Sequence, residues 1–171
     1  MILRVLQPAD DRSEFSCGDP DCDDFLRRYA GQNQFDHHIS TTLVIVDDER
    51  VVAYATFAVA EVSRDELTPA SASGLPAYPL PALRLGRLAV DARYQGIGLG
   101  TRLVREVLRT ALRLRGELGC AAVLVDALPE SADFYADLGF EPAVAIAGRP
   151  RIPRTVLMTL PLKDVAGAAG E

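Results

Sequence analysis

The stretch Arg93-Tyr94-Gln95-Gly96-Ile97-Gly98-Leu99-Gly100-Thr101 carries three glycines within five residues. Residues 83–91, just before it, have the apolar character of a β-strand. From Gly98 onward apolar residues recur at helical spacing and make one stripe: Leu103, Val104, Val107, Leu108, Ala111 and Leu112. Gly116 and Gly119 predict the end of that helix. The glycines therefore form a turn from a strand into a long helix.

A glycine turn at the start of a helix is suited to bind a phosphate. Glycine has no Cβ, so the backbone can adopt positive φ and bring several N–H groups close to an anionic oxygen, where the helix N-terminus adds partial positive charge. A tight turn without a ligand explains the same glycines equally well. A dinucleotide-binding G-x-G-x-x-G starting at Gly96 or Gly98 would need glycine in place of Thr101 or Leu103, and the Walker lysine is absent.

The other segments predict a mixed α/β fold. Alternating or β-branched runs predict strands over residues 2–6, 41–46, 51–62, 121–126 and 154–160, and shorter patterns predict helices around 23–31 and over 131–138. The charged residues 47–50, Asp-Asp-Glu-Arg, indicate a hairpin turn. Residues 63–81, rich in Ser, Ala and Pro, are expected to be a loop. The order of elements predicts a mixed sheet with one parallel strand pair, joined by the helix that starts at Gly98. A ligand is expected at the carboxyl ends of that pair.

Length and composition favour one globular domain. The chain has 171 residues, of which 49% are hydrophobic and 25% charged. We expect a single domain over residues 1–162 and a flexible tail over 163–171. No run of about 18 apolar residues predicts a membrane helix, so a cytoplasmic protein without an anchor is expected. Cys17, Cys22 and Cys120 show no metal-binding spacing and are expected to be reduced thiols.

Charge is unevenly distributed along the chain. The formal net charge is −6, which argues against a protein that binds nucleic acid over its whole surface. Residues 1–50 hold five arginines and eleven acidic residues, whereas residues 80–120 hold eight arginines and three acidic residues. The segment around the glycine turn therefore forms a basic region within an acidic chain.

The glycine turn and its neighbours resemble the GCN5-related N-acetyltransferase (GNAT) family. Gln95, Gly98 and Gly100 match the family signature (Arg/Gln)-x-x-Gly-x-(Gly/Ala), which follows the fourth strand. The strand before it, the crossover helix, the next strand, Ala132-Asp133-Phe134-Tyr135 and Gly139-Phe140-Glu141-Pro142 follow the family order. The resemblance implies the GNAT fold, a central and mostly antiparallel sheet with a splayed parallel strand pair and flanking helices.

The same resemblance implies an acetyl-coenzyme A site and a catalytic acid. Backbone amides of the turn would bind the pyrophosphate of the cofactor, and main-chain groups of the preceding strand would hold its pantetheine arm. These cofactor-binding residues are Leu88, Ala89, Val90, Gln95, Gly96, Ile97, Gly98, Leu99, Gly100 and Thr101. Tyr135 would protonate the departing thiolate, since a phenol with a pKa of about 10 is protonated at neutral pH. Core packing beside Phe134 is the alternative for this tyrosine.

No residue stands out as a general base. His37 and His38 lie in a polar connector and are expected to be exposed. Glu61 and Asp126, near predicted strand ends, are candidates for a base acting through water. An acceptor amine that is already neutral would need none.

Within the family, the pieces Phe15-Ser16-Cys17-Gly18, Asp23-Asp24-Phe25-Leu26, Leu85-Gly86-Arg87-Leu88-Ala89-Val90-Asp91 and Val125-Asp126-Ala127 resemble the acetyltransferase toxins of type II toxin–antitoxin pairs. The resemblance implies aminoacyl-tRNA as acceptor and a ribbon-helix-helix antitoxin as partner. Other hypotheses are an acetyltransferase for a small amine or a protein N-terminus, and an inactive acetyl-coenzyme A-binding module. A homodimer is a further possibility.

Arginines are the candidates for contact with the acceptor. Arg102, Arg105, Arg109 and Arg113 recur on the helix opposite its apolar stripe, and with Arg93, Arg149, Arg151 and Arg154 they would contact RNA phosphates. Arg84 and Arg87 alternate on the strand before the turn and would orient the substrate. The alternative for the helix arginines is a solvated helix face.

Overall fold

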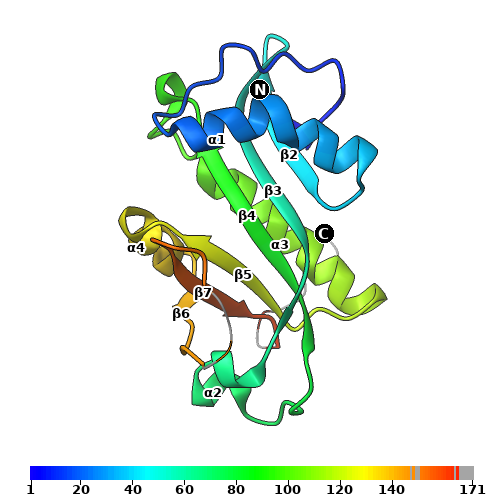
Figure 1. The fold of residues 1–171 in the computed structure, drawn as a ribbon, viewed down its shortest axis with the longest axis vertical. Helices are drawn as coiled ribbons and strands as arrows, with labels where there is room; N and C mark the ends of the chain where they lie inside the picture. Colours follow the sequence, from blue (N-terminus) through cyan, green and yellow to red (C-terminus); the bar gives the residue numbers. More distant parts are fainter. Residues whose placement is uncertain (147, 149–150, 164, 166–171) are drawn as a thin grey trace. The chain divides into compact units, whose positions relative to one another are not determined.

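The protein, described from a computed structural model over residues 1–146, 148, 151–163 and 165, has a mixed α/β fold with seven strands. The strands are hydrogen-bonded in the order β1-β2-β3-β4-β5-β7-β6, and the sheet contains one parallel pair (Figure 1). The helix α3 (Leu99–Glu117) connects the neighbours β4 (Leu80–Val90) and β5 (Ala122–Ala127). The predicted fold class, a mixed sheet with flanking helices, is confirmed.

The chain forms two compact units. Unit 1 comprises Met1–Ala58 and Leu85–Val107, and unit 2 comprises Val59–Arg84 and Leu108–Glu171. Each unit has its own hydrophobic cluster.

Unit 1 contains an antiparallel arrangement of β1 (Ile2–Val5), β2 (Thr41–Asp47) and the first part of β3 (Arg50–Val62). Asp48 and Glu49 join β2 to β3 with φ of 44° and 69°. Two consecutive residues with positive φ are typical of the tight hairpin turns that match the twist of antiparallel strands. The predicted hairpin is therefore confirmed.

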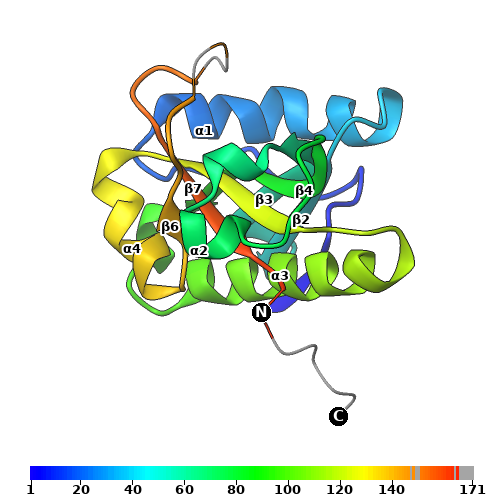
Figure 2. The same ribbon diagram turned by 90° about the horizontal axis from the view of Figure 1, so that it is seen from below.

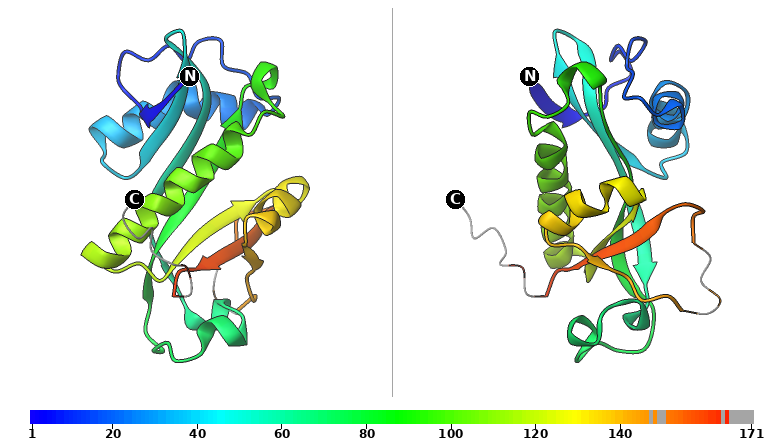
Figure 3. Two further views of the ribbon diagram at one scale, coloured as in Figure 1. Left: turned by 180° about the vertical axis from the view of Figure 1, so that it is seen from behind. Right: turned by 90° about the vertical axis from the view of Figure 1, so that its left-hand side faces the viewer.

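A helical segment over residues 20–36 covers one face of unit 1, and the first part of α3 covers the other (Figure 3). The segment consists of α1 (Pro20–Asp24) and two π-helical stretches, η1 (Phe25–Tyr29) and η2 (Gln32–Asp36). Asp19 caps its start by accepting from the amide of Asp21, and Pro20 follows at the first helical position. The helix predicted around residues 23–31 is thus real but longer, because its start depends on this acidic cap rather than on apolar spacing.

The cluster at the centre of unit 1 joins the sheet to the helical segment. Tyr54 of β3 is fully buried and contacts Phe15 edge-on, with ring centroids 5.5 Å apart. The other buried members are Leu6, Leu26, Ala30, Val44, Val46, Val51 and Ala89. Burial of a large apolar side chain stabilises by about 1.5–3 kcal/mol, so this cluster fixes the helical segment against β3 and β4.

Unit 2 contains the end of β3, the start of β4, β5 and β7 (Val156–Pro161), which lies antiparallel between β5 and the short β6 (Glu141–Pro142). The 3₁₀-helix η5 (Pro129–Ser131) leads into α4 (Ala132–Asp137), and Gly139 follows at φ 99°. The predicted strands and the short helix closed by glycine are confirmed within a few residues. The two-residue β6 was not predicted, because so short a strand has no periodicity.

The prediction that residues 63–81 form a loop is wrong in part. They contain the 3₁₀-helix η3 (Arg64–Glu66) and the helix α2 (Pro69–Ala72), and β4 already begins at Leu80. Ser63 and Glu66 form a capping box, and Thr68 caps α2 with Pro69 after it. These caps start elements too short to show an apolar period. The helix α2 lies beside β6, where Thr68 and Ser71 both donate to Glu141 at 3.3 Å (Figure 2).

The end of α3 also differs slightly from expectation. Gly116 lies inside the helix, which ends at Glu117, and Gly119 adopts φ 96° while its amide donates to the carbonyl of Leu114. Glycine permits this left-handed conformation after a helix. Of the predicted tail over 163–171, only Lys163 and Val165 belong to the described residues.

Candidate functional site

The glycine turn of unit 1 lies between the 3₁₀-helix η4 (Ala92–Tyr94) and α3. Gly96 and Gly98 have φ of 81° and 87°. Apart from the glycine itself and its two chain neighbours, no heavy atom lies within 4 Å of the position that a Cβ would take at either residue. The amide of Arg102 donates to the carbonyl of Gly98 at 3.1 Å, which starts the helical hydrogen bonding. The first amides of a helix have no acceptor within it. The turn is thus open on its outer side and carries the N–H groups and partial positive charge that suit a phosphate.

The side chain of Gln95 fixes the turn to the rest of unit 1. Its Nε2 donates to the carbonyl of Val90 at 2.9 Å and to the carbonyl of Cys17 at 3.1 Å. The backbone of Gln95 remains available to a ligand, whereas its side chain has a structural role.

Asp91 is a buried carboxylate directly before the turn and was not predicted as a site residue. Its side chain is 1% exposed and accepts from the amides of Ser16 and Arg93 and from Nε and Nη2 of Arg93, the latter two at 3.0 and 3.1 Å. The guanidinium of Arg93 holds the pKa of Asp91 below its usual value, and the backbone hydrogen bonds act in the same direction. The sequence signal for this role was an aspartate placed to cap Ala92-Arg93-Tyr94.

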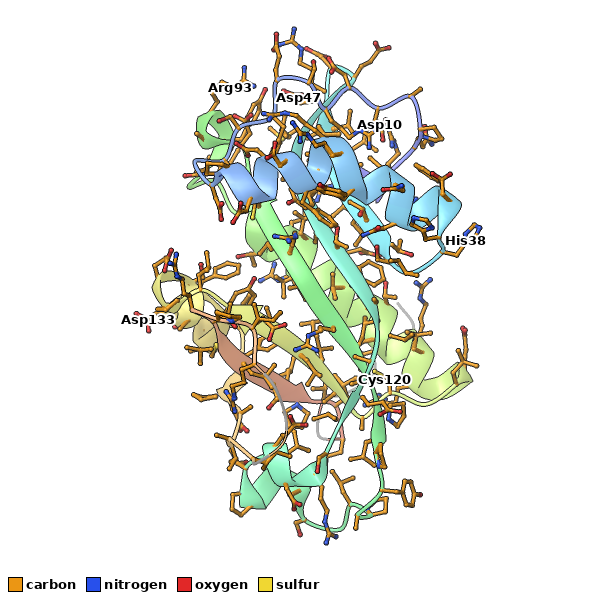
Figure 4. All side chains as sticks on the ribbon, in the orientation of Figure 1. Asp10, His38, Asp47, Arg93, Cys120 and Asp133 are labelled. Atoms are coloured by element: carbon orange, nitrogen blue, oxygen red, sulfur yellow. The ribbon has the colours of Figure 1, made fainter. Side chains whose placement is uncertain are left out.

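Tyr94, in the 3₁₀-helix η4 before the glycine turn, connects this part of unit 1 to the hairpin between β2 and β3. Its hydroxyl donates to Oδ2 of Asp47 at 3.0 Å, and this hydrogen bond to a carboxylate raises the pKa of Tyr94. Arg93 and Asp47 lie at one end of the unit, and His38 lies at the other end of the helical segment and points outward (Figure 4). His37 and His38 are exposed, as expected.

The end of β4 places its predicted site residues on alternate faces. Ala89 is buried in the unit 1 cluster, and Leu88 and Val90 are half-buried. Successive strand residues point to opposite sides of a sheet, so Leu88 and Val90 share the face opposite to Ala89. Arg87 shares the face of Ala89 and lies over the ring of Phe25, with 4.6 Å from the guanidinium carbon to the ring centroid.

Tyr135 belongs to unit 2 and lies on α4. The residue is 5% exposed, and its ring contacts Phe134 and Phe140 edge-on, with ring centroids 5.0 and 5.6 Å apart. The amide of Phe140 donates to the carbonyl of Tyr135 at 3.1 Å, which closes the turn after the helix. The aromatic contacts fix the ring, so the catalytic and the packing hypotheses for this residue are compatible.

Unit 2 also brings together Arg84 and Asp126. Nε and Nη2 of Arg84 donate to the two carboxylate oxygens of Asp126 at 2.7 and 3.0 Å. Asp126 is 5% exposed, whereas Arg84 is 39% exposed. The candidate base Asp126 and the candidate substrate residue Arg84 therefore bind each other. Glu61, the other candidate base, is exposed on β3.

The arginines of α3 lie on its outer side. Arg102, Arg105, Arg109 and Arg113 are exposed, whereas Leu103, Val104, Val107 and Ala111 are buried. Arg151 and Arg154 are exposed as well, and Arg149 lies outside the described residues. The predicted amphipathic division of the helix is confirmed.

Other kinds of site find no support in the described residues. No group of three or more His, Cys, Asp or Glu side chains among them is arranged to hold a metal ion. Cys17, Cys22 and Cys120 are free thiols, and burial raises the pKa of each, that of Cys17 to about 12. Within the described part of the chain, no helix is long and apolar enough to cross a membrane.

Known proteins match the chain over most of its length. Residues 38–142 match the family model for the acetyltransferase (GNAT) domain. A tRNA-acetylating toxin of Mycobacterium tuberculosis is 35% identical over 139 residues, which are 81% of this chain and 82% of the toxin. Two solved structures cover almost all of the chain. A tyrosine-to-phenylalanine mutant of KacT has a TM-score of 0.80 at 26% identity, covering 94% of this chain and 95% of its own. AtaT complexed with acetyl-methionyl-tRNAfMet has a TM-score of 0.81 at 25% identity, covering 95% of each.

Proposed function

The chain belongs to the acetyltransferase (GNAT) family, and we propose that it transfers the acetyl group of acetyl-coenzyme A to the α-amino group of aminoacyl-tRNA, as the toxin of a toxin–antitoxin pair. The observation that carries the proposal is the open glycine turn at the start of α3, with positive φ at Gly96 and Gly98. The relatives named as a tRNA-acetylating toxin and as AtaT with acetyl-methionyl-tRNAfMet support the choice of acceptor.

The cofactor site consists of the turn and the end of β4. The backbone amides from Gln95 to Gly100, with Thr101 in the first turn of α3, bind the pyrophosphate, and main-chain groups of Leu88 and Val90 bind the pantetheine arm and polarise the thioester carbonyl. Acetyl-coenzyme A supplies the activated acetyl group. The open space above Gly96 and Gly98 fits a phosphate group that approaches the backbone closely.

Tyr135 is the general acid of the proposed reaction. When the acceptor amine forms its bond to the acetyl carbon, the bond from that carbon to the sulfur of coenzyme A breaks and the thiolate takes a proton from the phenol. The proton that the amine nitrogen loses as it becomes an amide passes to solvent, and solvent returns a proton to the phenolate. The edge-on contacts with Phe134 and Phe140 hold the ring in place, which reduces the entropy lost when the hydroxyl meets the sulfur.

The acceptor amine enters the reaction already neutral. An ordinary α-amino group has a pKa of about 8, and the ester carbonyl of an aminoacyl-tRNA withdraws electrons and lowers the pKa of the amine further. A dedicated base is then unnecessary, consistent with Asp126 being held by Arg84. Exposed arginines on α3, foremost Arg102, Arg105 and Arg109, contact RNA phosphates, as does Arg93.

The cellular setting follows from this activity. We place the enzyme in the cytoplasm, where charged tRNA is found, and expect a ribbon-helix-helix antitoxin as its partner, with a homodimer as a possible assembly. We treat residues 1–162 as one acetyltransferase domain, because the matched residues 38–142 draw on both compact units.

The direct test incubates the purified protein with labelled acetyl-coenzyme A and total charged tRNA. We expect label in the aminoacyl fraction and growth arrest when the protein is expressed without the product of a neighbouring ribbon-helix-helix gene. Label found only on small amines or protein N-termini would replace the toxin proposal with a general N-acetyltransferase. Binding of acetyl-coenzyme A without transfer to any amine would indicate an inactive binding module.

A further inference from the structure

Arg87 stands at one end of an aromatic stack inside unit 1. Its guanidinium lies 4.6 Å above the ring of Phe25, and that ring stacks on Tyr54 at 6.2 Å with 18° between the ring planes. The hydroxyl of Tyr54 donates to the carbonyl of Cys22 at 2.7 Å, and Tyr54 is fully buried. The stack therefore ends at a residue that is fixed in the core, Tyr54. Phe25 is held by its contact with Tyr54, and in turn it restricts the position of the Arg87 guanidinium.

Phe25 holds this position because it begins the π-helical stretch η1. A π-helical turn adds a residue to the ordinary helical turn, and such turns often occur at functional sites. Here the wide turn follows α1 directly, with Leu26 beside it fully buried in the cluster. The helical segment and β4 together position the guanidinium.

Among the residues that the structure describes, no acidic side chain neutralises the charge of Arg87. In the described part of the chain, no carboxylate forms an ion pair with Arg87, and no hydrogen bond from its guanidinium is present. Arg84, three residues earlier on the same strand, differs in this respect because Asp126 takes two of its donors. Arg87 is half-buried, so its N–H donors remain accessible while its position is restricted.

A planar guanidinium with free donors and fixed orientation is suited to a bidentate contact with an oxyanion. We propose that Arg87 binds the phosphate nearest to the acceptor amine, that is, the phosphodiester 5′ of the terminal adenosine of aminoacyl-tRNA. The inference rests on the function proposed above. In that acceptor the amino acid is esterified and has no free carboxylate, so the closest anion is this phosphate.

The position of Arg87 agrees with such a role. It precedes Leu88, the first of the β4 residues assigned to the cofactor, and it points to the face covered by the helical segment. Leu88 and Val90 point to the opposite face. The cofactor arm is assigned to main-chain groups, which lie in the plane of the sheet, whereas the side chain of Arg87 projects from one face, so both ligands can contact the same strand at once.

The test uses two short acceptors, 3′-(aminoacylamido)-3′-deoxyadenosine with and without a 5′-phosphate, beside total charged tRNA. Their amino acid is that of the tRNA acetylated by the wild-type enzyme. We expect the wild type to have a KM about 10- to 100-fold lower for the phosphorylated compound. Arg87→Gln should abolish that preference, with the same KM as the wild type for the unphosphorylated compound and unchanged affinity for acetyl-coenzyme A. Arg87→Lys should restore only part of the preference, since lysine has no planar fork.

Two further variants test whether the phosphate preference depends on Arg87 and its position, and not on the loss of any positive charge or on a folding defect. Arg28→Gln removes an exposed arginine of the same unit and should keep the full phosphate preference. Phe25→Leu leaves Arg87 in place without its ring and should reduce the preference while kcat is retained. The wild type could acetylate charged tRNA and yet use the two compounds equally well, or use neither of them. Either result overturns the role of Arg87 and leaves the proposed function intact. Failure of the wild type to acetylate charged tRNA overturns the proposed function and this inference with it.

Discussion

The guanidinium of Arg84 and the carboxylate of Asp126 face each other through two hydrogen bonds of 2.7 and 3.0 Å. Because the pair occupies both groups, we expect Asp126→Asn to retain turnover and its pH dependence while the protein loses stability. The free energy of unfolding should fall by about 1.5–3 kcal/mol, the range for hydrogen bonds to charged groups. The loss should be smaller than for a fully buried ion pair, because the Arg84 side chain is 39% exposed. Chemical denaturation and a pH–rate profile measure the two effects. A variant of wild-type stability that has lost turnover would instead identify Asp126 as the base.

Gly98→Val should abolish acetyl-coenzyme A binding while the protein still folds. The residue has φ 87°, which costs an L-amino acid about 1–2 kcal/mol, but no atom lies within 4 Å of its Cβ position. The side chain would therefore obstruct the ligand rather than the protein. Calorimetry measures the affinity and thermal unfolding the stability. Gly116→Ala, in the last turn of α3 with an equally open Cβ position, is the matched control and should bind normally. Wild-type affinity in folded Gly98→Val would remove the turn from the cofactor site.

Tyr135→Phe should preserve cofactor affinity and reduce kcat by about 10² or more, the usual range for a missing proton transfer. The phenylalanine ring keeps the edge-on packing with Phe134 and Phe140, so stability should change little. Single-turnover kinetics isolate the chemical step. Tyr135→Leu provides the comparison, since it removes both the hydroxyl and the aromatic ring and should also unfold at lower temperature. Unchanged single-turnover rates in the phenylalanine variant would exclude Tyr135 as the acid.

Reversing the charge of Arg102 and Arg105 should weaken acetylation of charged tRNA and flatten its salt dependence. Both side chains are exposed on α3. For every RNA phosphate that the variant no longer binds, the slope of log affinity against log salt should fall by about 1. Acetyl-coenzyme A binding should be retained, and Arg28→Glu should leave the slope nearly unchanged. Identical slopes for the Arg102→Glu/Arg105→Glu variant and the wild type would show that this helix face does not contact RNA.

Asp91→Asn should destabilise the protein at neutral pH but not in acid. Contact with Arg93 lowers the pKa of Asp91, so the ionised form stabilises the fold at pH values above the ordinary aspartate pKa of about 3.9. As the pH falls from that value towards the lower folded pKa, the unfolded chain binds a proton at Asp91 that the folded chain does not, so the stabilisation by the ionised form is lost. Urea denaturation should show a constant difference between pH 5 and 8 that narrows below about pH 4. A difference independent of pH would mean that the hydrogen-bond geometry matters and the charge does not.

The elements with a clear period could be predicted from sequence, and those started by local capping could not. The apolar stripe from Leu103 to Ala111 predicted α3, and the β-branched runs predicted β2 and β3, because burial of one face imposes a regular spacing. The helix α2 depends on Thr68 and Pro69 over a single turn, and the π-helical stretches differ from an α-helix by one residue per turn. Neither produces a period that is visible in the sequence.

The candidate site divides in the same way. The glycine turn was predictable because Gly96 and Gly98 are there for backbone conformation, which the residue type itself reveals. The pairing of Arg84 with Asp126 and the stacking of Arg87 on Phe25 join residues 42 and 62 positions apart. The identity of a charged residue does not reveal whether its partner is a carboxylate, an aromatic ring or solvent. The partners of these arginines could therefore be identified only from the three-dimensional structure.

The amide of Gln95 makes its hydrogen bond to Cys17 across 78 residues of chain. Every residue of the glycine signature lies within the matched range 38–142, yet one of the two carbonyls that hold Gln95 lies before it. A fragment that begins at residue 38 would retain the signature residues but would lack the Cys17 carbonyl and the helical segment. Transplanting the nine-residue stretch into another strand-to-helix connection would likewise transfer its glycines without this brace. The nine residues alone therefore do not carry everything that the turn needs. A protein that contains this motif must also provide a backbone carbonyl, from a distant part of its chain, to accept from Gln95.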